Sequence, residues 1–488
     1  MILQALWRVK MGSSILSVMV ISCFLANPIL TINMMSNELK KNSLGLIQSV
    51  IMGVAGSAPS YSISATMATL IAAVGVLAPA SLFYCGLIMV GIVMAYRQLN
   101  GHNANAGASY AWVSEIFGMR LGFFAGWALM VASALFMVSA TVPAASATFL
   151  LFAPQWVDSQ TAVTLCALAW LTLVTVVVVV GVGLTARIQM IMTICELAVL
   201  TIISVLILFH YGPAHQHLIS WQQFSLKAFT AESFASGAVI ALFFFWGWDV
   251  TLNLNEETES AKQSPGLGAV GAVLVIIAAF TGFAAVVLLA LSDEQITQAG
   301  TNVIFVVADK ILPAPWNYLG VLALMLSTIG TVETSILQFT RTMFSQSRDG
   351  LLHPRWAKIH PIWNTPYSAT LLIFLFGSFF LIASLASKDI SEVMSKSINV
   401  IGVQAAYYYG LAGFACAWHF RHKAMRSVVN FLLIFLWPLA SSLVLWWAAA
   451  LTISGFDAIT MAIAIGSMSL GCWPLWRHAR LLRKQPLD

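Results

Sequence analysis

Charged residues are scarce in this sequence of 488 residues. Only 8% of the residues are Asp, Glu, Lys or Arg, whereas 60% are hydrophobic and the mean hydropathy is +0.88. Soluble domains carry roughly 25% charged residues, so this chain cannot build a water-exposed surface. The composition therefore predicts an integral membrane protein in contact with the lipid bilayer, and it leaves no room for a separate soluble enzyme domain.

Cysteine is also rare, and the six cysteines lie within apolar runs rather than in loops. Buried thiols are inert as a rule, and this pattern argues against a disulfide framework. The sequence contains no paired acid and base, metal-ligand spacing or nucleophile elbow. We therefore expect neither an enzyme nor a protein with a cofactor or metal, and nucleic acid is not an expected partner.

Long apolar runs bounded by charges or turn residues predict twelve membrane spans in an all-α protein. The predicted spans are residues 45–73, 75–96, 121–152, 161–183, 186–210, 233–255, 266–291, 316–341, 367–386, 397–419, 428–452 and 456–476. Seventeen of the 23 Lys and Arg residues fall on the side of Lys40 and Lys41, and four on the other. The positive-inside rule then places both ends of the core in the cytoplasm, with the protein in the cytoplasmic (inner) membrane.

A further apolar stretch, residues 13–34, precedes the predicted core. If it crossed the membrane, it would carry a basic end outward, against the charge bias. Three interpretations remain: a cleaved leader, an interfacial helix, or an extension upstream of a native start near Met34 or Met35. We favour the last two. The predicted domains are an N-terminal segment (1–34), a transport core of ten spans (35–419), and two peripheral helices with a basic tail (420–488).

Two of the predicted spans, the first and the sixth, are interrupted near their middle. The first contains Gly53, Gly56 and Pro59, and the sixth contains Gly247 between two tryptophans. Proline has no amide hydrogen, and glycine does not resist unwinding. Two five-helix halves that each open with a broken helix indicate an inverted-repeat transporter whose binding site lies at the midplane. A simple proline kink is the alternative for the first span.

These interruptions supply the candidate substrate-binding residues. An opened helix offers free amides to an anionic group, and aromatic faces can hold an ammonium group. We expect the amides of Ser57, Ala58 and Ser60 to be available and Asp249 to face a polar cavity. Phe243 and Phe244 are expected to be helix packing. The candidate residues are Gly56, Ser57, Ala58, Pro59, Ser60, Phe245, Trp246, Gly247, Trp248 and Asp249.

Three acids inside predicted spans, Glu196, Asp249 and Glu333, are candidates for proton coupling or cation recognition. An ionised group there costs at least about 2.5 kcal/mol unless it meets water or a partner. The alternative for either glutamate is a neutral side chain that donates one interhelical hydrogen bond.

Other polar groups leave further alternatives open. Glu256, Glu257 and Glu259 lie at the predicted cytoplasmic mouth, where a solvated helix end or a gate is expected. Hydroxyl oxygens on the eighth span could bind sodium, so proton and sodium remain alternative coupling ions. These hydroxyls belong to Ser327, Thr328 and Thr331.

Five stretches of the chain resemble the amino acid/polyamine/organocation permease superfamily over about residues 44–476. They are residues 53–62 (GVAGSAPSYS), 107–126 (GASYAWVSEIFGMRLGFFAG), 184–196 (LTARIQMIMTICE), 245–257 (FWGWDVTLNLNEE) and 341–354 (RTMFSQSRDGLLHP). The resemblance implies a LeuT-like five-plus-five core with discontinuous first and sixth helices and two peripheral helices. It also implies that the first break receives a substrate carboxylate and the sixth an amino group.

The sequence departs from this superfamily at two positions. Many relatives have a lysine where Glu196 stands, and its ammonium group holds the opened first helix; that role does not transfer to an acid. Relatives often read Gly-Ser-Gly where this chain reads Gly-Ser-Ala at residues 56–58.

The sequence as a whole predicts a secondary active transporter of an amino acid or small amine, present as a monomer or homodimer. It is expected to be coupled to protons and to work by alternating access. An exchanger, a sodium-coupled transporter, and a cation channel or cation transporter are the alternatives.

Overall fold

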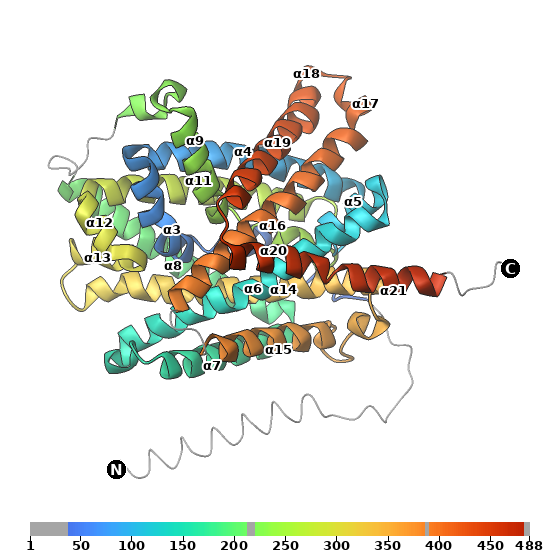
Figure 1. Cartoon of the computed structure of the whole chain (residues 1–488), viewed down its shortest axis with the longest axis horizontal. Helices are drawn as coiled ribbons and strands as arrows, with labels where there is room; N and C mark the ends of the chain where they lie inside the picture. Colours follow the sequence, from blue (N-terminus) through green and yellow to red (C-terminus); the bar gives the residue numbers. More distant parts are fainter. Residues whose placement is uncertain (1–37, 212–219, 386–389, 483–488) are drawn as a thin grey trace, which may run out of the picture. The chain divides into compact units, whose positions relative to one another are not determined.

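The computed structural model describes residues 38–211, 220–385 and 390–482 (Figure 1). Within these residues the regular structure is helical, apart from one isolated parallel bridge between Leu44 and Thr258. The predicted N-terminal segment, residues 1–34, lies outside the described residues, so the choice among its three interpretations stays a prediction.

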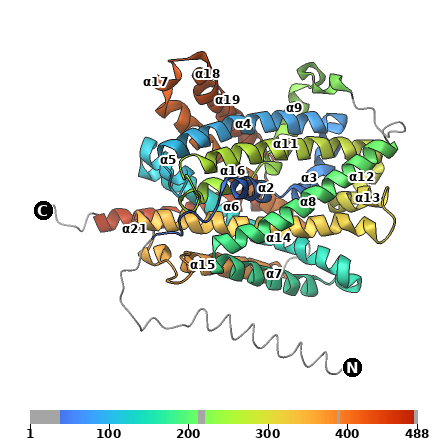
Figure 2. The ribbon, with the colours of Figure 1, turned by 180° about the vertical axis from the view of Figure 1, so that it is seen from behind.

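The helices keep their chain order in the labels of Figures 1 and 2. The α-helices are α2 (Leu46–Ser57), α3 (Pro59–Val74), α4 (Ala78–His102), α5 (Ser109–Phe117), α6 (Met119–Phe152), α7 (Gln160–Val180), α8 (Val182–Tyr211), α9 (Ala231–Phe244), α10 (Val250–Asn253), α11 (Ser264–Ala290), α12 (Asp293–Ala299), α13 (Val303–Asp309), α14 (Leu319–Arg348), α15 (Tyr367–Ser384), α16 (Ile390–His419), α17 (Arg421–Ala424), α18 (Val428–Asn430), α19 (Trp437–Ser454), α20 (Ala458–Ser469) and α21 (Cys472–Leu482). The short helical segments are η1 (Gly75–Leu77), η2 (Pro154–Trp156), η3 (Trp221–Phe224), η4 (Leu226–Ala228), η5 (Asn255–Glu257), η6 (Gly300–Asn302), η7 (Trp316–Tyr318), η8 (Pro354–Ala357) and the π-helix η9 (Phe431–Leu436).

Ten helical segments of the described chain are long and apolar enough to cross a membrane. The first of them, Leu46–His102, contains the first two predicted spans, and the sixth predicted span corresponds to the shorter α9 together with α10. The prediction of an all-helical membrane protein is confirmed, whereas the twelve-span, five-plus-five arrangement stays a prediction. Helix α14 continues to Arg348, beyond its predicted end at Arg341, because Arg341 is buried and paired inside the protein.

Helix α14 packs against α6 in the middle of the bundle. In Figures 1 and 2, α4 and α11 lie on one side of this pair, and α7 and α15 lie on the other. Along α14 runs a stripe of fully or almost fully buried polar residues that includes Ser327, Thr331, Gln338 and Arg341. Polar groups in the membrane interior need partners there, so α14 is the main source of hydrogen bonds for the core.

The first predicted interruption is present between α2 and α3. Ala58 joins the two helices in the left-handed backbone conformation, with φ 47° and ψ 71°. Pro59 follows as the first residue of α3 and has no amide hydrogen to donate. The amide of Ser60 leaves the helix ladder and donates to Oε1 of Glu196 in α8 at 2.7 Å.

Helix α14 bonds the other main-chain groups that this break exposes. The amide of Tyr61 donates to Oγ of Ser327 at 3.2 Å, and Oγ1 of Thr331 donates to the carbonyl of Gly56 at 3.1 Å. Broken helices are tolerated in membranes where neighbouring side chains satisfy the freed groups in this way. The first span is therefore interrupted by a true break whose free main-chain groups are bonded by α8 and α14, and it is not a simple proline kink.

The second predicted interruption separates α9 from α10. Helix α9 ends at Phe244 and helix α10 begins at Val250, with Gly247 at φ 99° between them. The freed amide of Gly247 donates to the hydroxyl of Tyr409 in α16 at 3.2 Å.

The two breaks meet through their backbones. A Cβ atom added at Gly56 would lie 2.2 Å from the carbonyl oxygen of Gly247, and one added at Gly247 would lie 2.2 Å from the carbonyl oxygen of Gly56. Any other residue at either position would force the two chain segments apart. Glycine at 56 and 247 is therefore the condition for this contact.

We expect Gly56→Ala to destabilise the protein by about 1–3 kcal/mol, because overpacking must separate the breaks. Ala58→Gly is the matched control. The left-handed conformation costs an alanine about 1–2 kcal/mol, and the extra entropy of glycine offsets about 0.5–1 kcal/mol of that, so this variant should be as stable as the wild type or slightly more stable. Thermal unfolding of the detergent-purified proteins measures both effects. A wild-type melting temperature for Gly56→Ala would contradict the close approach.

Candidate functional site

The structure brings the predicted site residues of both breaks together and buries them. The ten buried candidates are Gly56, Ser57, Ala58, Pro59, Ser60, Phe245, Trp246, Gly247, Trp248 and Asp249. They are surrounded by side chains of α8, α14 and α16, three helices distant in sequence from the breaks.

The prediction that the amides of Ala58 and Ser60 are available for a ligand is wrong in this structure. The amide of Ala58 donates to the carbonyls of Val54 and Ala55 at 3.2 and 3.1 Å, and the amide of Ser60 is bound by Glu196. A carboxylate is stabilised at a helix N-terminus by the helix dipole and the free amides. Glu196 therefore holds the position beside α3 that an external anion would otherwise find open.

Asp249 is fully buried beside the second break. Its Oδ1 atom accepts hydrogen bonds from the hydroxyl of Tyr409 at 2.7 Å and from Nε2 of Gln338 at 2.8 Å, with the hydroxyl of Tyr408 at 3.5 Å. Its Oδ2 atom has no hydrogen-bond partner among the described residues. One carboxylate oxygen thus supports the second break, and the other is buried without a hydrogen-bond partner among the described residues.

Aromatic rings enclose this acid. Trp248 stacks on Tyr409 with ring centroids 5.3 Å apart and planes at 16°, and Nε1 of Trp246 donates to the hydroxyl of Tyr408 at 3.0 Å. Because the helix is interrupted, the two tryptophans contact different neighbours; Trp246 also packs edge-on against Phe136 of α6. Sequence reasoning found the tryptophans but missed the tyrosines, whose adjacent positions in an apolar span carry no local signal.

Glu333 lies in α14 and faces α8 rather than the breaks. With the amide of Gln189 oriented so that its nitrogen points at this acid, Nε2 donates to Oε2 of Glu333 at 2.7 Å and to the carbonyl of Gly330 at 3.3 Å. Gln189 and Glu196 are seven positions apart on α8, which corresponds to about 10 Å along the helix axis. Two buried acids therefore lie along the same α8–α14 interface.

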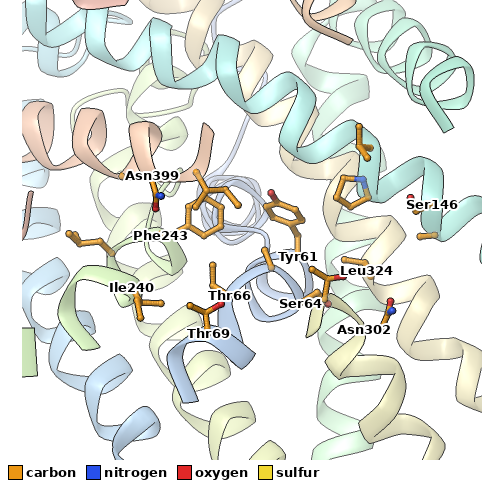
Figure 3. Close-up of a pocket in the computed structure, with 18 of the residues that line it drawn as sticks. Tyr61, Ser64, Thr66, Thr69, Ser146, Ile240, Phe243, Asn302, Leu324 and Asn399 are labelled. Carbon is orange, nitrogen blue, oxygen red and sulfur yellow. The ribbon is translucent and has the colours of Figure 1, made fainter. Parts of the chain in front are cut away.

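A cavity of about 450 Å³ lies beside the two breaks, and residues of α3, α6 and α9 contribute to its lining (Figure 3). Its polar lining consists of hydroxyl and amide groups, and none of its lining residues is charged: Ser64, Thr66 and Thr69 of α3, Ser146 of α6, Thr301, Asn302, Asn399 and Thr452. Asp249 does not line this cavity, contrary to the prediction that it faces a polar cavity, because the tyrosine hydroxyls and Gln338 occupy the space around it.

Tyr61 and Phe243 separate this cavity from the breaks. Both line it, and their ring centroids are 6.1 Å apart in an edge-on arrangement (Figure 3). The prediction that Phe243 packs between helices is confirmed, since its side chain belongs to the buried core, and its ring also lines the cavity. The hydroxyl of Tyr61 donates to the carbonyl of Ser139 at 2.9 Å and fixes this ring.

The opposite end of the site is closed by a buried ion pair. Nε and Nη2 of Arg341 donate to the two carboxylate oxygens of Glu257, each at 2.9 Å, and both side chains are fully buried. The expectation that Glu257 belongs to a solvated helix end is wrong, because Arg341 lies inside the bundle rather than at the membrane edge. Whether the pair acts as a gate stays a prediction.

Polar contacts extend this closure to neighbouring segments. Asn253 donates to the carbonyl of Ala106 at 2.9 Å, and Asn255 donates to Oδ1 of Asn100 at 2.8 Å. The carbonyl of Glu257 accepts from the main chain that leads into α2. The end of the second broken helix is thereby tied both to the α4–α5 connection and to the start of the first.

A family model matches this chain along most of its length, and two known proteins resemble about a third of it. A family model described as amino acid permease matches residues 44–484. The branched-chain amino acid permease BcaP of Bacillus subtilis (strain 168) is 26% identical over 191 residues, which cover 38% of this chain and 38% of that protein. The vacuolar cationic amino acid transporter 8 of Arabidopsis thaliana is 27% identical over 150 residues, which cover 30% of this chain and 25% of that protein.

We expect Glu257→Gln to destabilise the protein by about 3–5 kcal/mol, because it leaves the buried guanidinium of Arg341 without its counter-charge. Replacing the pair together, Glu257→Leu with Arg341→Met, should retain more stability, since it removes both buried charges. Thermal unfolding compares these variants.

Glu256→Gln is the control for the buried pair. Glu256 pairs with Arg348, whose side chain is 36% exposed, so its loss should cost at most about 1 kcal/mol. An equal loss of stability in Glu256→Gln and Glu257→Gln would show that burial of the Glu257–Arg341 pair does not increase its contribution to stability.

Proposed function

Since the chain belongs to the amino acid permease family, we propose that it is a secondary active transporter of amino acids or related small amines. The match over residues 44–484 also confirms its resemblance to the wider permease superfamily. One observation carries the proposal: two broken helices meet backbone to backbone beside buried acids that have no cationic partner among the described residues.

Alternating access around the breaks is the proposed mechanism. The uncharged cavity above Tyr61 and Phe243 is the entry path, and the Arg341–Glu257 side is closed, which corresponds to an outward-facing arrangement. The positive-inside bias supports placing the closed end in the cytoplasm. Transport then requires the aromatic pair to admit the solute and the ion-pair side to release it.

The solute is proposed to bind between the two breaks. Its amino group is placed at the free Oδ2 of Asp249 and against the ring of Trp246 or Trp248, where a cation is attracted by an aromatic face. A carboxylate, where the solute has one, requires amides of the first break, and these are released when α2 and α3 separate further. Opening of the first break is therefore part of binding.

Glu196 is the proposed coupling residue, with a proton as the coupling ion. Ionised, it caps α3 through the amide of Ser60; protonated, it loses the charge that the helix dipole favours, and the cap weakens. Glu333, next along the α8–α14 interface, is the proposed second proton site. Sodium stays the alternative coupling ion, since the hydroxyl of Thr331 donates to the carbonyl of Gly56 and keeps its own oxygen lone pairs.

A thermal-shift screen of the purified protein identifies the solute. The protein is tested against all amino acids and common amines at two pH values, with and without sodium, because a ligand that binds the folded state raises its melting temperature. Counterflow of the labelled hit in proteoliposomes then tests transport. A channel shows no saturable counterflow, so its absence would overturn the proposal.

We expect Glu196→Gln to abolish uphill, pH-driven uptake while counterflow continues. The glutamine side chain keeps an oxygen that can accept the bond from Ser60, but like the protonated acid it lacks the charge that the helix dipole favours. The cap is therefore fixed in its weaker, neutral form and no longer responds to pH. Uptake under an imposed pH gradient and counterflow without one measure the two activities. Unchanged pH dependence in this variant would remove Glu196 as the coupling group.

Asp249→Asn should weaken solute binding by about tenfold or more, since a hydrogen bond to a charged group contributes roughly 1.5–3 kcal/mol. Its amide oxygen can still accept the bonds from Tyr409 and Gln338, so the break remains supported. Isothermal titration with the identified solute measures the change. Tyr409→Phe is the comparison variant, because it removes one support of the break and leaves the carboxylate charge; an unaltered affinity in Asp249→Asn would exclude an ammonium site here.

A further inference from the structure

A second cavity lies away from the breaks, between α6, α14, α15 and the α20–α21 pair. Its volume is about 880 Å³, and most of its lining is apolar. Trp127, Met130 and Leu135 come from α6, Phe339 from α14, and Leu372 and Phe376 from α15. In Figure 1, α6 and α14 lie between α20 on one side and α15 on the other. This cavity is therefore bordered by helices long and apolar enough to cross the membrane.

Two arginines stand at the end of this groove. Arg355 follows α14 in η8, and Arg477 belongs to α21; both line the groove and are exposed. Neither forms an ion pair with an acid among the described residues, and no acidic residue lines the groove. The groove thus combines a long apolar wall with two unneutralised positive charges at one end.

Helix α21 has the features of a helix at the membrane surface. Trp473 and Trp476 are exposed, and the guanidinium groups of Arg477 and Arg480 lie 5.9 and 3.6 Å from their ring centroids. Tryptophan and arginine together are typical of the interface between hydrocarbon and water. This composition matches the level of the lipid headgroups, and Arg477 of the groove belongs to this helix.

We propose that this groove binds one anionic phospholipid, with an acyl chain along α6 and α15 and its phosphate between Arg355 and Arg477. The apolar wall matches a hydrocarbon chain, and the two positive charges match a phosphate that carries a net negative charge. A zwitterionic phospholipid fits the wall equally but leaves the pair of charges uncompensated. The positive charges of Arg355 and Arg477 are therefore expected to select an anionic over a zwitterionic phospholipid.

The bound lipid contacts the segment that follows α14. Gly350 and Leu352 line the groove, and the ring of His478 lies within hydrogen-bond distance of the carbonyl of Gly350, 3.0 Å away. Helix α14 carries Arg341 and Arg348, whose ion pairs with Glu257 and Glu256 hold the closed end of the transport site. Lipid at this groove thus stabilises the end of α14 from the membrane side, independently of which solute is transported.

The test uses the purified full-length chain in detergent with added lipid. We expect dioleoylphosphatidylglycerol to raise the melting temperature more than dioleoylphosphatidylcholine does, and native mass spectrometry to show one retained phosphatidylglycerol. In the double variant Arg355→Gln with Arg477→Gln, the apparent affinity for phosphatidylglycerol should fall about 25-fold, at about fivefold per arginine. Both arginines are exposed, so this variant is expected to fold.

Two further variants and one small ligand make the test specific. Arg480→Gln removes a charge from the same helix outside the groove and should leave the affinity unchanged. Ala134→Phe fills the apolar wall without changing charge and should lower the affinity for both lipids. Equal shifts with the two lipids, an equal loss in Arg480→Gln, or the same shift with inorganic phosphate alone would each overturn the proposal.

Discussion

The structure depends on one constraint: a helix can open inside a membrane only where its freed main-chain groups find other partners. The first break meets this constraint through Glu196, Ser327 and Thr331, and the second through Tyr409. The unusual polarity of α14 follows from this, because a wholly apolar helix at that position would leave the amide of Tyr61 and the carbonyl of Gly56 unbonded. The breaks and their supporting helices therefore form one unit, and a change in any support alters the geometry of the site.

The breaks were predictable from sequence because their causes are local. Pro59 removes a donor, and Gly56 and Gly247 permit a backbone contact, whatever the rest of the chain does. Their supports are tertiary. Nothing in the residues around Tyr409 or Gln338 indicates which acid they meet, and the burial of Glu257 follows only from the position of Arg341. A charged residue at the end of an apolar run can mark a membrane boundary or form an ion pair inside the protein. The sequence pattern is the same in both cases.

The reversed charge at position 196 has a physical explanation in the geometry of the break. An ammonium group cannot accept a bond from the amide of Ser60, whereas a carboxylate can, and the helix dipole favours the negative charge there. Adding a proton to this carboxylate removes its charge, so the proposed coupling at Glu196 acts through the stability of the break itself.

The two ends of the site are closed by interactions of different kinds, and this difference bears on the order of events in transport. Tyr61 and Phe243 meet edge-on through ring contacts, which are weak individually and allow the rings to move without leaving an unpaired polar group. Arg341 and Glu257 are both fully buried. If they separate before water reaches them, each leaves an uncompensated buried charge, which is energetically costly. In the proposed transport cycle, the aromatic end opens by thermal motion, whereas the ion-pair end opens only when water enters or when another event repositions α10 and α14. Asp249 directly precedes α10, which leads into η5 and Glu257, and Gln338 lies one turn before Arg341 on α14. A ligand at the proposed site beside Asp249 would therefore act on both segments that lead to the ion pair. Occupation of the site can thus be linked to release on the far side without a separate signalling element.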